Sequence, residues 1–446
     1  MRIAYLAAGA ANMYCGSCLH DNTLAAALLK IGADIVLVPT YTPMRLDEPS
    51  VSQRQVLFGG INLYLQDWLP GYRHLPSFVH RTLDAHWVHK LVAKLDFSVD
   101  ASRLGSLTVA MLEGERGAVK KEVFHLVDFL AEHIQPQIVH LTNALLMGLA
   151  PHVKRQLRVP VVCSLSGEDI FFEKLTPKYR DRVRVLMQER AAEIDRFVAL
   201  NAYYADVMSD YLAIERSRIS VIPHGLKLEG HTLRQPRTSP PSAESPLRIG
   251  YLARICRDKG LHQLVEAFKV LAADRTLPPL RLEAAGYLGA SDRPYLSQIE
   301  QTIAAAGLAR QFQYRGELTR DEKLAFLQSL DLFSVPTVYR ESKGLSILEA
   351  LANGVPVVQP RHGSFVEMIA STEGGLLFEP GDIPDLVAKL KQLILDPALA
   401  QRLGEHGHRA VQAQFDDRHM AEQTLEVYEE VEGAKRKAES GKRTKM

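Results

Sequence analysis

The sequence predicts an α/β protein with two doubly wound domains, each a parallel sheet between layers of helices. Short apolar runs such as DIVLV (34–38) and VPVVCSL (159–165) alternate with stretches of helix length through most of the chain. Runs this apolar are typical of strands covered on both faces, which favours parallel sheets. A segment rich in proline and serine (234–246) interrupts the alternation, which then restarts. We expect two such domains facing each other across a cleft, with ligands beyond the carboxyl ends of the strands.

The first domain is expected over residues 1–230. After an apolar run at the N-terminus, its strands are predicted at 34–38, 137–141, 159–165, 196–200 and 219–223. Residues 53–118 contain both tryptophans and few strand signals, so we interpret them as a helical insertion. This insertion could be an extra packing layer over the sheet or a surface that binds an acceptor.

The second domain is expected over 248–415, after an interdomain linker at 231–247. Its strands are predicted at 247–254, 280–286, 312–316, 331–336 and 355–360, and a helix is predicted over 261–273. A final helix over 416–433 is expected to cross back to the first domain. The basic tail 434–446 is expected to be disordered, with weak attraction to anionic lipid as an alternative.

Composition narrows the class of protein. The chain has 446 residues and a formal net charge of +1, which gives no electrostatic case for binding nucleic acid. Its 16 histidines are scattered without the spacing of metal ligands, and four cysteines are too few for a disulfide scaffold. No apolar stretch reaches the ~20 residues that span a bilayer. We therefore expect a cytoplasmic protein, with peripheral contact to a membrane as the alternative.

The segment YRESKGLSILEALANGVPVV (339–358) carries the strongest chemical signal. Its leucines have helical spacing, and Ser342 is predicted to cap a helix that ends near Gly354. The free amides and dipole at the start of such a helix favour a diphosphate. Glu349, one turn in, could accept hydrogen bonds from ribose hydroxyls, and Glu341 lies on the loop before the helix.

Glu341 and Glu349, with seven residues between them, resemble the E-x7-E signature of retaining glycosyltransferases of family 4, which have the GT-B fold. The stretch IGYLARICRDKGLHQLVEAF (249–268) resembles the start of the family's donor domain, where an arginine and a lysine grip the donor diphosphate. Here these are Arg254 and Lys259. The stretches VIPHGL (221–226) and GGLLFEPGDIPDLVAKLKQLILDP (374–397) also resemble the family. The resemblance is strong from about 195 to 430 and thin over 45–160.

This resemblance implies two Rossmann-like domains and transfer of a sugar from a nucleotide-diphosphate sugar to a hydroxylated acceptor with retention. It implies catalytic roles for Arg254, Lys259 and Glu341, with Glu341 holding sugar hydroxyls rather than acting as a nucleophile. Cations and a helix start can stabilise a leaving diphosphate without metal, and the sequence has no Asp-x-Asp motif. We therefore expect no cofactor and no metal. The residues expected to bind the donor are Gly16, Ser17, Gly316, Glu317, Ser342, Lys343, Gly344, Leu345 and Glu349.

The acceptor side departs from the family pattern. A histidine is common after the strand equivalent to 159–165, but this sequence has Ser166 near that position, followed by Glu168 and Asp169. The acidic pair could orient the acceptor in place of the histidine, or it could cap the helix that follows. We predict an acceptor-side role for Ser166, Glu168 and Asp169.

The motif CGSC (15–18) follows the first strand and precedes the first helix. In a GT-B enzyme this loop approaches the donor phosphates, and Gly16 and Ser17 could bring backbone amides near them. A redox dithiol would favour one small βαβ domain, and a zinc site would need two more ligands. The cysteines are therefore interpreted as small loop residues.

Other functions are compatible with parts of this pattern. A non-catalytic nucleotide-sugar-binding protein would fit Ser166 in place of histidine, and an epimerase or phosphorylase would share the GT-B fold. A nicotinamide-dependent dehydrogenase is disfavoured, because no Gly-x-Gly-x-x-Gly follows either first strand. The donor base and sugar, the acceptor and the oligomeric state are not predicted.

Overall fold

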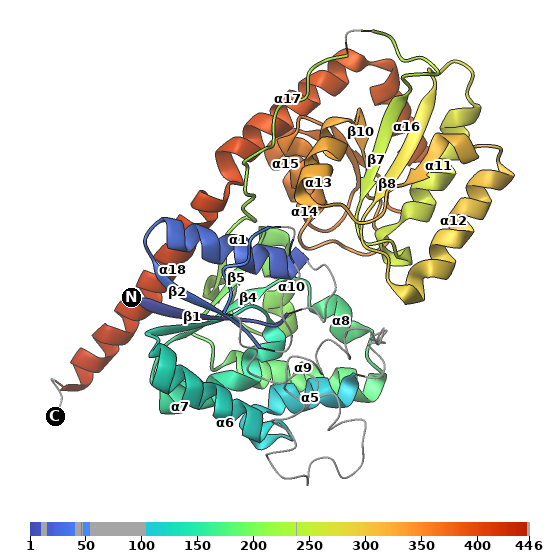
Figure 1. Cartoon of the computed structure of the whole chain (residues 1–446). Coiled ribbons are helices and arrows are strands. Elements are labelled where there is room, and N and C mark those ends of the chain that lie inside the picture. Colours follow the sequence, from blue (N-terminus) through green and yellow to red (C-terminus); the bar gives the residue numbers. More distant parts are fainter. Residues whose placement is uncertain (10–15, 41–45, 47, 54–103, 238, 444–446) are drawn as a thin grey trace. The chain divides into compact units, whose positions relative to one another are not determined.

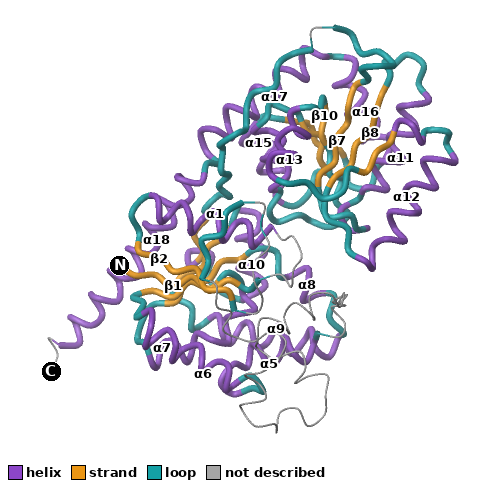
Figure 2. Tube along the Cα trace, viewed as in Figure 1, coloured by secondary structure: helices purple, strands orange, loops and turns teal. Residues whose placement is uncertain are grey.

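The computed structural model describes residues 1–9, 16–40, 46, 48–53, 104–237 and 239–443 (Figure 1). The chain divides into two units, Met1–Gly225 with Asp417–Met446, and Leu226–Asp416. Each unit contains one six-stranded sheet whose paired strands are all parallel, and helices surround the strands of each unit (Figure 2). The prediction of two doubly wound α/β domains is confirmed. Most of the expected insertion, residues 54–103, lies outside the described residues.

The sheet of the first unit has the strand order β2-β1-β3-β4-β5-β6. Its strands are β1 (Arg2–Ala7), β2 (Asp34–Pro39), β3 (Ile138–Leu141), β4 (Val161–Leu165), β5 (Arg196–Ala199) and β6 (Ile219–Val221). All residues of β3 and β4 are buried, as the unbroken apolar runs predict for strands covered on both faces. The chain reverses its direction of strand addition between β1 and β3, so the switch point of this sheet lies there.

Helices cover both faces of the first sheet. They are α1 (Gly16–Lys30), α5 (Gly105–Glu113), α6 (Lys120–Phe129), α7 (Ala150–Gln156), α8 (Asp169–Glu173), α9 (Pro177–Ala191), α10 (Ala202–Leu212) and α18 (Asp417–Arg443). Apolar residues of α1 and α18 form one core with β1, and those of α5 to α10 form a second core. His140 of β3 also contacts α18, because its Nδ1 lies 2.6 Å from the Tyr428 hydroxyl. Burial lowers the pKa of His140 to about 3, so its ring is neutral.

The sheet of the second unit has the order β12-β11-β10-β7-β8-β9. Its strands are β7 (Leu247–Leu252), β8 (Leu280–Ala285), β9 (Phe312–Tyr314), β10 (Leu332–Phe333), β11 (Val357–Pro360) and β12 (Gly375–Phe378). The chain adds β8 and β9 on one side of β7, and then β10, β11 and β12 on the other. The switch point therefore lies between β7 and β10, where loops diverge and leave room for a ligand.

Seven helices are described in the second unit. They are α11 (Leu261–Ala273), α12 (Arg293–Ala305), α13 (Arg320–Gln328), α14 (Leu345–Ala352), α15 (Ser364–Thr372), α16 (Ile383–Leu395) and α17 (Pro397–Gln414). They bury one apolar core with the sheet. The helix predicted over 261–273 coincides with α11.

The end of the chain differs from the prediction. The final helix was expected to stop at residue 433 and to be followed by a disordered tail, but α18 continues to Arg443. Residues 434–443 contain lysine, arginine, alanine and glutamate, which are good helix formers, and they extend an existing helix without a new nucleation cost.

Candidate functional site

The loops after β7 and β10 meet at the switch point of the second unit. Lys259 lies on the β7 loop, just before the start of α11, and Gly260 follows it with a φ of +76°. A Cβ at Gly260 would lie 1.7 Å from the carbonyl oxygen of Pro336, which belongs to the β10 loop. Glycine at this position therefore allows the two loops to touch. Arg254 lies on the same β7 loop and donates from Nε to the Cys256 sulfur at 3.4 Å.

Glu341 is the centre of this loop contact. Its Oε2 accepts from Lys259 Nζ at 2.5 Å and from the Tyr339 hydroxyl at 2.8 Å, and Lys259 Nζ also lies 2.5 Å from that hydroxyl. Its Oε1 accepts from the backbone amides of Ser342 and Lys343 at 3.1 and 3.2 Å. The carboxylate therefore has four donors, and only 8% of the side chain is exposed.

The charge states of this cluster follow from these contacts. Burial by itself raises the pKa of Glu341, but the Lys259 ammonium, the Tyr339 hydroxyl and the Lys343 amide outweigh burial and hold it at about 2. Burial and the nearby Glu341 charge raise the pKa of Tyr339 well above its usual value. At neutral pH Glu341 is therefore an anion and Tyr339 is a neutral donor. The Lys259 ammonium also lies over the Tyr339 ring, 5.0 Å from its centre.

The start of α14 differs in detail from the prediction. Gly344, with a φ of +67°, is the N-cap, and no side chain caps the helix, although Ser342 was expected to do so. The physical reason is that α14 begins only at Leu345, so the N-cap position falls on Gly344, whose left-handed backbone turns the chain into the helix. The first amides of α14, beginning at Leu345, have no acceptor within the helix, as at any helix start.

Glu349, expected to accept ribose hydroxyls, forms a buried ion pair within the second unit. Its Oε1 pairs with Lys323 Nζ of α13 at 2.6 Å, and both side chains are more than 90% buried. The carboxylate expected to accept ribose hydroxyls is thus tied to a buried ammonium. Gly316 and Glu317 lie on the loop after β9, two strands from β7, where the carbonyl of Gly316 accepts from the Gly286 amide at 2.9 Å.

In the first unit, Gly16 and Ser17 form the first turn of α1 rather than a loop. The loop itself, residues 10–15, lies outside the described residues. At the switch point of this sheet, Asp21 of α1 accepts from the hydroxyls of Tyr5 and Thr142 at 2.8 and 2.6 Å. This buried network fixes the start of α1 against β1 and the end of β3.

The acceptor-side residues lie together at the carboxyl end of β4. Glu168 accepts from the amides of Ala144 and Ser166 at 2.9 and 2.6 Å, and from the Tyr204 hydroxyl at 3.2 Å. Glu168 precedes α8 but makes no capping bond to it, so its carboxylate joins the loops after β3 and β4. Asp169 accepts from the Tyr204 hydroxyl at 2.7 Å. Burial raises the pKa of Asp169, and this hydrogen bond partly offsets the effect.

Three of the four cysteines lie among the described residues. Cys163 and Cys256 are buried free thiols, Cys18 is buried, and Cys15 lies outside the described residues. Within the part of the chain that the structure describes, no three His, Cys, Asp or Glu side chains gather in a way that could hold a metal ion. No helix among the described residues is long and apolar enough to cross a membrane.

Sequence reasoning missed the residues that hold Glu341 in place. Tyr339 stands two residues before Glu341, and side chains two apart on an extended loop point the same way, which was an available signal. His362 Nε2 donates to the carbonyl of Thr337 at 3.0 Å, and the amide of Ser364 donates to the carbonyl of Glu341 at 2.7 Å. These contacts join the β11 loop to the β10 loop, and no local pattern in the sequence indicates them.

Comparison with known proteins gives the same division of the chain. Residues 235–410 match the family described as glycosyl transferases group 1, and residues 22–229 match Glycosyltransferase Family 4. Sucrose-phosphate synthase from Thermosynechococcus elongatus aligns with 97% of this chain and 100% of its own, with a TM-score of 0.68 and 17% identity. The two domains and the fold are those of GT-B glycosyltransferases.

Further proteins are similar to this chain in structure or in part of the sequence. The Anabaena protein HepE in complex with UDP aligns over 96% of this chain and 99% of its own, with a TM-score of 0.64 and 15% identity. The 2-deoxystreptamine glucosyltransferase of Streptomyces kanamyceticus is 31% identical over 42% of this chain and 46% of its own length. Glycogen synthase of Mycobacterium tuberculosis is 26% identical over 66% of this chain and 69% of its own. The first of these curated relatives is thus matched over about half of its length.

Proposed function

We propose that this protein transfers a sugar from a nucleotide-diphosphate sugar to a hydroxyl group of an acceptor, with retention and without a metal ion. The observation that carries the proposal is the cluster at the switch point of the second unit. There Lys259, held by Glu341 and Tyr339, lies on the same loop as Arg254, beside the loop that leads to the start of α14. Cations and free amides gathered at one edge of a sheet suit a diphosphate.

The chemical demand of the reaction explains this arrangement. When the bond between the sugar and the diphosphate breaks, negative charge builds on the leaving oxygens. Cations that are already in place stabilise this charge without reorganising, which is the main source of rate in such sites. Arg254 can offer two parallel N–H groups to a phosphate, and Lys259 offers a point charge. The leaving phosphate can then take the proton of the acceptor hydroxyl.

The contacts of Glu341 favour a supporting role over attack on the sugar. A carboxylate has about four lone-pair sites, and four donors already engage this one. A nucleophile must present a free oxygen to the anomeric carbon, whereas Glu341 uses both oxygens to hold Lys259 and its own loop. Retention would therefore arise from departure and attack on the same face. Substrate that displaces one of the two amide donors would let Glu341 contact a sugar hydroxyl.

The acceptor would be oriented from the first unit. Glu168 is occupied in joining two loops, so Asp169, which accepts from the Tyr204 hydroxyl and does not bridge the loops, is the better candidate to accept from an acceptor hydroxyl. Ser166, on the same loop, would contact the acceptor where related enzymes commonly have histidine. UDP-sugars are the first donors to test, because HepE binds UDP in the same fold.

The experiment is nucleotide release from UDP-, GDP- and ADP-sugars in the presence of EDTA. It compares the wild type with Glu341→Gln and with Glu300→Gln, a matched change at an exposed position on α12. We expect release from one donor that EDTA does not change, that Glu341→Gln lowers at least about tenfold, and that Glu300→Gln leaves intact.

Each other result has a distinct meaning. Loss of release in EDTA that Mg²⁺ restores would overturn metal independence. Calorimetric binding of a donor without release in any acceptor mixture would favour the non-catalytic alternative. No binding of any nucleotide sugar would overturn the proposal.

A further inference from the structure

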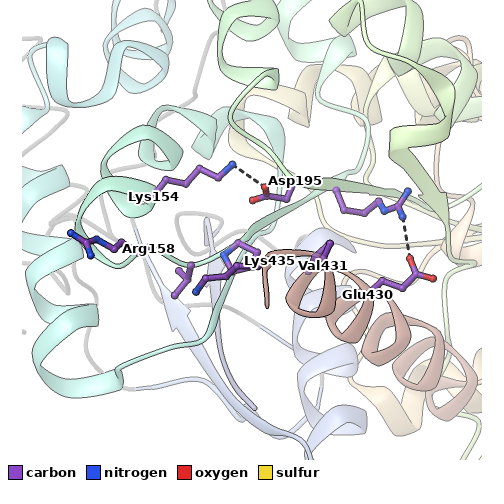
Figure 3. A pocket seen from close by; sticks show the side chains of 10 residues that line it. Lys154, Arg158, Asp195, Glu430, Val431 and Lys435 are labelled. Carbon is purple, nitrogen blue, oxygen red and sulfur yellow. Dashed lines mark hydrogen bonds and ion pairs between the residues drawn. The ribbon is translucent and has the colours of Figure 1, made fainter. Parts of the chain in front are cut away.

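A pocket lies at the amino edge of the sheet in the first unit, away from the carboxyl ends that carry Ser166 and the start of α1 (Figure 3). It has a volume of about 520 Å³. Its walls come from the end of α7, the connection to β4, the start of β5 and residues 430–435 of α18. The lining residues are Lys154, Arg158, Val159, Pro160, Asp195, Arg196, Glu430, Val431, Ala434 and Lys435.

The charges of this pocket leave a positive surplus. Four cations line it against two acids, and each acid already has a cationic partner. Lys154 Nζ lies 2.9 Å from Asp195 Oδ1, and Arg196 Nη2 lies 3.0 Å from Glu430 Oε2 (Figure 3). The second oxygen of Asp195 accepts from the Val161 amide at 2.7 Å. The acids are thus committed within the protein, and the net charge of the lining is positive.

Arg158 supplies a guanidinium that the described structure does not use. It is exposed on the connection between α7 and β4, and it makes no hydrogen bond or ion pair with any residue that the structure describes. Lys435 of α18 adds a second cation to the lining. From Lys435 onward the sequence has six lysines and arginines and one glutamate, so the positive charge continues along the chain.

The remaining lining residues are apolar. Val159 and Val431 are only 7% and 8% exposed, and Pro160 is buried. The lining therefore combines cations with apolar side chains, which suits a phosphate group attached to a carbon skeleton. A guanidinium prefers phosphate because its planar N–H groups match two phosphate oxygens.

We propose that this pocket binds the phosphate group of a phosphate ester, with Arg158 contacting the phosphate and Lys435 adding to the positive charge of the lining. The group could belong to the headgroup of an anionic lipid or to a soluble ester, and the chemistry of recognition is the same. The site is separate from the cluster around Lys259 and does not depend on the function proposed for it.

The test uses the full chain and two probes. The first is sn-glycerol 3-phosphate, measured by calorimetry, and the second is flotation with phosphatidylcholine vesicles with and without phosphatidylglycerol. The pocket variant is Arg158→Gln with Lys435→Gln. The matched control is Lys121→Gln with Arg310→Gln, which removes two exposed cations elsewhere. Arg254→Ala reports any binding at the switch point of the second unit.

We expect the pocket variant to bind the glycerol phosphate at least about tenfold more weakly, while the control and Arg254→Ala keep wild-type affinity. Flotation that requires phosphatidylglycerol and falls in the pocket variant would identify a lipid headgroup as the source. Glycerol phosphate binding without flotation would identify a soluble ester. Equal binding of both probes by wild type and pocket variant, loss of binding in Arg254→Ala, or no binding of either probe would overturn the proposal.

Discussion

The pair of Lys259 and Glu341 makes a quantitative prediction about the second unit. Lys259→Met removes the ammonium bonded to the Glu341 carboxylate, whose side chain is 8% exposed, so a buried anion loses its cationic partner. Loss of one member of a buried pair typically costs ~3 kcal/mol or more, because the remaining charge is desolvated and unpaired. Glu341→Gln leaves an ammonium that is 24% exposed and still next to the Tyr339 hydroxyl. We expect that change to cost less, about 1 kcal/mol.

The double variant Lys259→Met with Glu341→Gln removes both charges and leaves two neutral side chains. Its cost is expected to be about 2 kcal/mol, below the sum of about 4 kcal/mol for the single changes. The coupling energy is therefore about 2 kcal/mol. Urea unfolding of the four proteins, followed by a probe of the second unit, measures each term. The reasoning is refuted if the single costs add within about 0.5 kcal/mol, or if Glu341→Gln costs more than Lys259→Met.

Three further predictions concern the same unit. Asp331→Asn should cost about 2–4 kcal/mol in urea unfolding, because a carboxylate that is 7% exposed binds the guanidinium groups of Arg234 and Arg237 together; a loss below about 1 kcal/mol would contradict this. Gly363→Ala should strongly lower nucleotide release but change the melting temperature little. The added Cβ would lie 2.4 Å from the carbonyl oxygen of Glu341, at a φ of +59°, and would displace the loop that carries Glu341. Release at the wild-type rate would show that this loop moves without affecting the site. The Glu341 carboxyl, with its pKa lowered from 4.5 to about 2, should contribute stability that is present above pH 4.5 and is lost as the pH falls towards 2. The stability difference between wild type and Glu341→Gln should therefore shrink below pH 4.5, and a difference independent of pH would refute the assignment.

The sequence was sufficient for the fold because its signals are local. Apolar runs of strand length identified the strands of the second sheet from β7 to β11. Helical spacing predicted a helix over 261–273, where the structure has α11. Lys259 and Glu341 could be expected at one place, because they follow strands that become neighbours across a switch point.

The partners of the site residues could not be predicted in the same way. Glu349 is paired with Lys323, which lies on another helix 26 positions earlier, and only the packing of α13 against α14 decides that contact. Ser342 is not the cap because α14 begins at Leu345, two positions later than a cap at Ser342 requires, and the N-cap is Gly344. Sequence patterns identify candidate site residues, but packing between distant segments decides which hydrogen bonds these residues make.

The placement of α18 has a consequence for how the protein is made. The first unit buries Tyr428 and Met420 of this helix against β1 and β3, so its core needs residues that the ribosome adds after the whole second unit. The first unit therefore cannot complete its core during synthesis until the whole second unit and most of α18 have been added. A chain cut near residue 225 would expose the apolar face that α18 covers. The first unit would have to be expressed with α18 joined to it by a short linker.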